Sequence, residues 1–162
     1  MSQATRLANH IERTLTGPMW HGPALAEVLD GVTADQAAAR PIAGAHSIWE
    51  MVLHAAVWAE IARARVKGER LGDPTTEEDW PAPETASADT WQRARDRLAE
   101  SHRMLAADVR PLTDDALKEK VKSLDYTVSV LLHGVVEHST YHGGQIMMLR
   151  KAVVSGFSRT TM

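Results

Sequence analysis

Two histidines four residues apart stand near the C-terminal end of the chain, in the stretch EHSTYHGGQIMML that runs from residue 137 to 149. On a helix, His138 and His142 would be offset by only about 40°, because each residue advances about 100° around the axis. Both rings would then project in one direction, which is how a single helix offers two nitrogen ligands to a metal ion. Such pairs also occur by chance in many helices, so the pair alone leaves a metal site and a pair of core histidines equally open.

A third histidine favours the metal. His54 lies on an apolar line with Met51, Trp58 and Ile61 at helical spacing, so it is expected to point into the same interior from another helix. Three buried imidazoles without partners would be costly, and a shared ion would satisfy all of them.

The predicted ligand set is therefore His54, His138 and His142. Three neutral imidazoles suit zinc, nickel, cobalt or iron(II). Three protein ligands also leave coordination positions open for water or substrate, as catalytic sites require and structural sites do not.

The other five histidines are weaker candidates. His102 lies between Leu98 and Leu105 and is expected in the core or at its rim. His10 is a weak candidate for a fourth ligand, and His133 should not join the site, because it lies about 140° around the helix from the first histidine of the pair. The last two, His21 and His46, fall in predicted turns.

Two known metal motifs are absent from the sequence. Without His-Glu-x-x-His, the chain does not resemble the zinc proteases that carry this motif. Without Glu-x-x-His on a helix, it does not resemble the ferritin-like di-iron bundles.

The elements that must position these side chains are predicted to be helices. Apolar residues recur at helical spacing over residues 4–16, 48–67, 89–109 and 128–154, and no alternating strand pattern is convincing. Ser47 and Glu50 have the spacing of a capping box and predict the start of the second long helix at Ile48. The sequence thus predicts an all-α, four-helix bundle with short connecting helices near residues 24–32 and 33–40.

Two further features of these elements concern the site. The acidic, proline-containing stretch over residues 68–90 is predicted to be a long connection, and connections of this length are often functional or mobile. The last helix is expected to run through Gly143 and Gly144, whose missing side chains could let a neighbouring helix or a ligand approach.

Bulk composition sets broader limits. The 162 residues are 44% hydrophobic and fit one domain over 1–162. A net charge of −3 gives no electrostatic footprint for nucleic acid, and no apolar run approaches membrane-spanning length. Cysteine is absent and the N-terminus does not resemble a signal peptide, so a cytoplasmic protein is the simplest interpretation.

The stretches SIWEMVLHAAVW and LLHGVVEHSTYHGGQI resemble the DinB-like, or YfiT-like, family of metalloenzymes. The resemblance covers nearly the whole chain in helix order. It implies a four-helix bundle in which His54, His138 and His142 hold one divalent metal ion, usually nickel or zinc, with water completing the shell. The family is often dimeric, so a homodimer is expected.

Characterised members of that family include thiol-dependent enzymes that use bacillithiol or mycothiol, among them S-transferases and maleylpyruvate isomerase. The resemblance therefore implies a small-molecule substrate and a low-molecular-weight thiol as cosubstrate, with transfer of the thiol to an electrophile. No further motif ties the chain to a particular thiol. Because the chain has no cysteine, an attacking thiol must arrive on a small molecule.

Three alternatives stay open at the level of sequence. Attack by water would make the protein a metal-dependent hydrolase, and an ion without chemistry would make it a non-catalytic metal-binding bundle. A partner-binding bundle is the third, with Trp20 and Trp80 exposed at an interface. Arg40 and Arg150 are weak candidates for contacts to substrate, because arginines on helix surfaces are usually solvated.

Overall fold

Four long helices form the bundle that the apolar spacing predicts. The computed structural model describes residues 1–157, with side chains described up to residue 154. The long helices are α1 (Gln3–Thr16), α4 (Ile48–Val66), α6 (Ala88–Val109) and α7 (Val128–Phe157). The predicted all-α four-helix bundle is confirmed, with long-helix boundaries within three residues of those expected.

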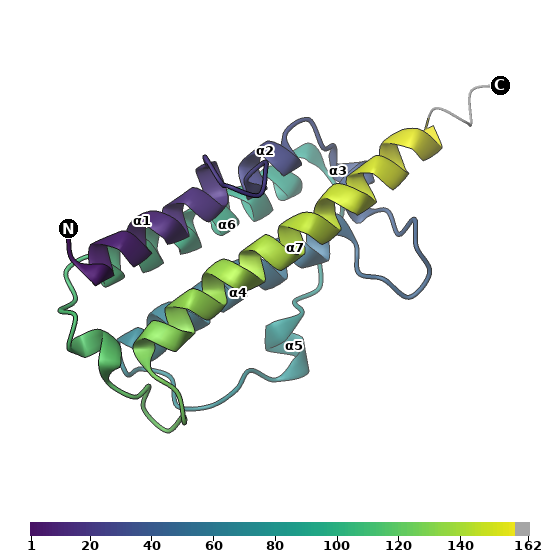
Figure 1. Cartoon of the computed structure of the whole chain (residues 1–162). Coiled ribbons are helices and arrows are strands. Elements are labelled where there is room, and N and C mark those ends of the chain that lie inside the picture. Colours follow the sequence, from purple (N-terminus) through teal and green to yellow (C-terminus); the bar gives the residue numbers. More distant parts are fainter. Residues whose placement is uncertain (158–162) are drawn as a thin grey trace.

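The packing order of the bundle brings the two histidine-bearing helices together. α4 packs against α6 and α7, and α1 packs against the same two helices, so α1 and α4 occupy opposite corners (Figure 1). His54 on α4 and the histidine pair on α7 therefore belong to neighbouring helices.

Local signals in the sequence set the start of α4. Ser47 accepts a hydrogen bond from the Glu50 backbone N–H at 3.2 Å, and the Glu50 carboxylate accepts one from the Ser47 backbone N–H at 2.8 Å. This capping box satisfies two N–H groups that the first turn of a helix otherwise leaves without partners. It fixes where α4 begins, and with it the direction in which His54 points.

Short helices connect the long ones. They are α2 (Leu25–Leu29), α3 (Ala34–Ala38), α5 (Thr76–Asp79) and the 3₁₀ helix η1 (Ala116–Lys118). The apolar spacing does not predict α5, which lies inside the 68–90 connection. It is capped reciprocally by Thr75 and Glu78, and it packs against α4 (Figure 1).

A polar layer divides the core into two apolar clusters. On α7, buried residues between 128 and 136 belong to one cluster and those between 146 and 153 to the other; α6 changes cluster between Leu98 and Leu105. The side chains in between are polar: Ser101, His102, His138, Ser139 and His142. The predicted metal ligands on α7 thus interrupt an otherwise continuous apolar stripe.

The last helix runs through both glycines, as expected, but no neighbouring helix makes a close approach at either of them. A Cβ on Gly143 would meet Leu25 Cδ2 at 3.5 Å, which is ordinary van der Waals contact, and a Cβ on Gly144 would meet nothing within 4 Å. The protein atoms around them therefore do not require glycine at either position, and the approach of a ligand there stays a prediction. None of the helices described is long and apolar enough to cross a membrane.

Candidate metal centre

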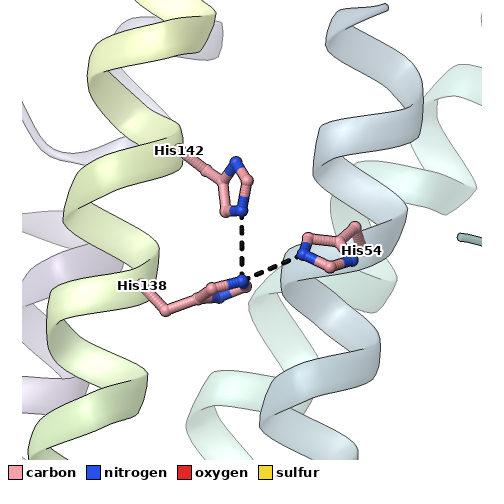
Figure 2. A group of neighbouring side chains, drawn as sticks. All are labelled: His54, His138 and His142. Carbon is pink, nitrogen blue, oxygen red and sulfur yellow. Dashed lines mark hydrogen bonds between the residues drawn. The ribbon is translucent and has the colours of Figure 1, made fainter. Parts of the chain in front are cut away.

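The three predicted ligand histidines converge between α4 and α7. Figure 2 shows His138 and His142 projecting from one helix towards His54 on the other. Their candidate ligand atoms lie within 4.8 Å of one another. His54 and His142 are buried, and His138 is partly buried. The inward direction expected for all three rings is confirmed.

The three rings meet through their Nε2 atoms. His138 Nε2 lies 2.9 Å from Nε2 of His54 and 3.1 Å from Nε2 of His142. Two nitrogens bound to one zinc ion at about 2.0–2.1 Å, with angles between octahedral and tetrahedral values, would lie about 2.9–3.4 Å apart. Both measured separations fall in that range.

The contacts at Nδ1 show which ring nitrogen carries the proton in His54 and in His142. His54 Nδ1 lies 2.8 Å from the Asp79 backbone carbonyl oxygen and 3.1 Å from Asp79 Oδ1, and both of these atoms are acceptors. His142 Nδ1 lies 2.7 Å from Gln145 Oε1. In the neutral rings Nδ1 therefore donates, and each Nε2 presents a lone pair towards the centre of the cluster.

This arrangement cannot be satisfied by the histidines alone. His138 Nε2 faces two lone pairs and can donate to only one of them. Its Nδ1 is buried and has no hydrogen-bond partner among the described residues. A cation that accepts three lone pairs resolves the conflict at the centre, so the donor set fits a metal ion.

The protonation behaviour of the cluster agrees with that assignment. Burial, followed by repulsion from His142 and His54, lowers the pKa of His138 to about 3. Burial also lowers the pKa of His54 and of His142, and the hydrogen bonds that these rings donate to Asp79 and Gln145 act in the opposite direction. All three rings are thus neutral at pH 7, which is the form that binds a metal.

The 68–90 connection covers one side of the cluster. Trp80 stacks between two imidazoles, with ring centroids 3.8 Å from His54 and 3.6 Å from His46 and near-parallel planes. The preceding residue, Asp79, also accepts a hydrogen bond from Trp58 Nε1 at 2.7 Å. Because α5 ends at Asp79, this short helix delivers both residues to the site.

A pocket of about 390 Å³ opens beside the cluster. Its polar lining residues are His54, His138, Asp79, Arg65 and Tyr126. The remaining lining residues are mostly apolar: Trp58, Val130, Leu131, Gly134 and Val135. Small molecules can therefore reach two of the three candidate ligands.

The remaining histidines lie outside the cluster. His102 is buried, as expected; its Nδ1 donates to the Leu98 carbonyl at 3.0 Å and its Nε2 accepts from Ser139 Oγ at 3.0 Å. His10 and His133 are not members of the group that could hold a metal ion. His21 is exposed in a turn.

The expectation of an exposed Trp80 is wrong, whereas the two arginines lie away from the pocket, as surface arginines are expected to. Trp80 is not an exposed interface residue, because it packs between two imidazoles; Trp20 is fully exposed. Neither weak arginine candidate lines the pocket. Arg40 pairs with Glu50 at 2.5 Å, and Arg150 donates to the Val28 carbonyl at 3.0 Å.

Four residues around the site were missed at the level of sequence. Asp79 and Trp80 come from the long connection, where no periodicity marked them. Gln145 follows His142 by three residues, a helical spacing that could have indicated the contact. Arg65 continues the apolar line of His54, Trp58 and Ile61 at helical spacing, and a charged residue on such a line is a visible signal.

The comparisons with known proteins agree with this architecture. The family model of the DinB superfamily matches residues 20–146, a range that includes all three clustered histidines. The chain belongs to that superfamily. The search of curated proteins and the search of solved structures gave no match.

Proposed function

We propose that His54, His138 and His142 hold one divalent metal ion, nickel or zinc, and that the protein is a metal-dependent enzyme that transfers a low-molecular-weight thiol to an electrophile. The observation that carries the proposal is the convergence of imidazole lone pairs at the wall of an open, mostly apolar pocket. A metal held by three protein ligands keeps positions for a further ligand, and the pocket gives that ligand access.

The surrounding residues have defined tasks in this proposal. Asp79 and Gln145 hold the proton on Nδ1 of His54 and His142, which keeps each Nε2 available as a ligand. Trp80 fixes the plane of His54 by stacking and shields it from water. When bound, the metal would supply a Lewis acid that lowers the pKa of a thiol or of water.

The proposed thiol transfer accounts for every bond, the leaving group and the proton. A thiol sulfur forms a bond to an electrophilic carbon, the leaving group departs with its electron pair, and the thiol proton passes to solvent. The sulfur must come from a small molecule, since the sequence has no cysteine. The apolar pocket wall at Trp58 and Leu131 suits the carbon skeleton of the electrophile.

A fluorogenic assay tests the proposal. The nickel- and zinc-loaded protein is incubated with monochlorobimane and, in turn, bacillithiol, mycothiol, coenzyme A, glutathione or cysteine. We expect turnover with at least one thiol, and a loss of at least 100-fold in His138→Ala. Turnover of ester substrates instead, with no thiol active, would replace the proposal with a metal-dependent hydrolase.

The absence of both activities in a protein that binds metal would leave a non-catalytic metal-binding bundle.

The cytoplasmic location and the homodimer stay predictions. Light scattering during size-exclusion chromatography measures the oligomeric state, and a strict monomer would contradict the homodimer.

A further inference from the structure

A buried cation lines the same pocket as His54 and His138. Arg65 is in the last turn of α4, and the residue is 3% exposed. A charged side chain is rarely buried to this extent unless it is paired. Its partners therefore decide whether the guanidinium is fully neutralised by the protein.

The protein groups around the Arg65 guanidinium accept hydrogen bonds from only some of its N–H donors. Nη1 donates to Tyr126 Oη at 2.9 Å, and Nη2 donates to the Gly72 carbonyl at 3.0 Å and to Asp73 Oδ1 at 2.8 Å. The Asp73 side chain is 80% exposed, so water screens the only one of these partners that carries charge. Nε has no acceptor among the described residues.

This cation and the histidine cluster share one pocket. Arg65, Tyr126, His54 and His138 all line the same 390 Å³. The guanidinium carbon lies 5.7 Å from the ring centroid of Trp58, and that ring lies 6.4 Å from the His54 ring. Because both distances are taken to the Trp58 ring, the Arg65 guanidinium carbon and the centre of the His54 ring are at most about 12 Å apart.

We propose that Arg65 and Tyr126 form an anion subsite that binds a carboxylate, or a similar small anionic group, on the substrate. The substrate class would be a short molecule with an apolar body, an anionic group at Arg65 and a reactive centre at the histidine cluster. The assignment of the reactive centre rests on the proposed function; the anion subsite does not.

The chemistry at the subsite suits such a group. A guanidinium presents N–H donors in a fixed plane that matches a carboxylate, and the Tyr126 hydroxyl accepts from Arg65 while its own proton remains available to donate. The apolar residues that line the rest of the pocket would hold the carbon skeleton. A purely structural Arg65, which only ties the turn at Gly72 and Asp73 to α4, is the alternative.

Calorimetric titration of the full-length protein distinguishes the two roles. The probes are hexanoate, hexan-1-ol and hexylamine at pH 7.5 and low salt, with butanoate and octanoate to vary length. The protein is used as purified and again after treatment with a chelator. We expect hexanoate to bind at least tenfold more tightly than hexan-1-ol in both forms, hexylamine to bind most weakly, and affinity to rise up to fourfold per buried methylene.

Variants give readouts that a structural role would not move. Asp73→Asn removes the exposed counter-charge and should raise hexanoate affinity severalfold without changing hexan-1-ol affinity. Tyr126→Phe should lower hexanoate affinity severalfold, and Arg65→Gln should abolish the preference for the carboxylate. Arg93→Gln removes an exposed cation paired with Glu84 and is the matched control, with no change expected.

Two results would overturn the subsite. One is equal binding of hexanoate and hexan-1-ol, or no binding of any probe up to octanoate. The other is a preference for hexanoate over hexan-1-ol that is unchanged in Asp73→Asn and Tyr126→Phe. This result would overturn the subsite even if Arg65→Gln does not fold. If the carboxylate preference is present but the protein binds no metal, the proposed function fails and the anion subsite stands.

Discussion

The replacement Asp79→Asn tests how the connection between α4 and α6 supports the histidine cluster. Asp79 contacts His54 Nδ1 twice, through its backbone carbonyl at 2.8 Å and its carboxylate at 3.1 Å. The substitution removes the negative charge and keeps the carbonyl. Loss of such a supporting partner typically reduces metal affinity about 10- to 100-fold, and the retained carbonyl places this variant near the lower end, about tenfold or 1.4 kcal/mol.

A competition titration against a chromophoric zinc chelator at pH 7.5 measures this change. Glu77→Gln is the matched control, because it removes an exposed carboxylate from the same short helix. Asp79→Ala should cost more in stability, about 1–3 kcal/mol, since Trp58 Nε1 also loses its acceptor at 2.7 Å. Equal zinc affinity in Asp79→Asn and the unaltered protein would refute the role assigned to the Asp79 carboxylate.

Three further outcomes are expected. Trp80→Ala removes the ring stacked on His54 at 3.8 Å, so zinc should leave several times faster in stopped-flow release to a chelator; an unchanged rate would contradict the shielding role. Burial lowers the pKa of His102 to about 4, so the unfolded state binds the proton more readily and His102 alone should lower the free energy of unfolding by roughly 3 kcal/mol between pH 6.5 and 4. Chemical denaturation at several pH values should show that the free energy of unfolding falls less steeply with decreasing pH in His102→Gln. The same pH dependence in both proteins would contradict this role of His102. Zinc at 100 times its Kd should stabilise the protein by about 2.7 kcal/mol and raise Tm by roughly 5–10 °C, whereas His138→Ala should show no shift in calorimetry.

The sequence predicted the bundle well because its signals are local. Apolar spacing and the capping box at Ser47 determine where α4 begins, and the same spacing shows which way His54 faces. The convergence with His138 and His142 followed once two helices were expected to pack through those faces.

The supporting residues were harder to predict because they depend on how a connection folds back. The stretch over residues 68–90 has no periodicity, yet α5 within it brings Asp79 and Trp80 to His54. Such contacts are set by tertiary packing rather than by spacing along one helix. Arg65 is different, since its place on the apolar line of α4 was visible and its meaning became clear only with the pocket.

Metal analysis of the purified protein tests the central claim most directly. The protein is loaded with nickel or zinc, freed of unbound metal, and measured by inductively coupled plasma mass spectrometry beside His54→Ala and His138→Ala. We expect about one ion per chain in the unaltered protein and a large loss in both variants. A metal-free protein, or metal content that is unchanged in both variants, would contradict the account.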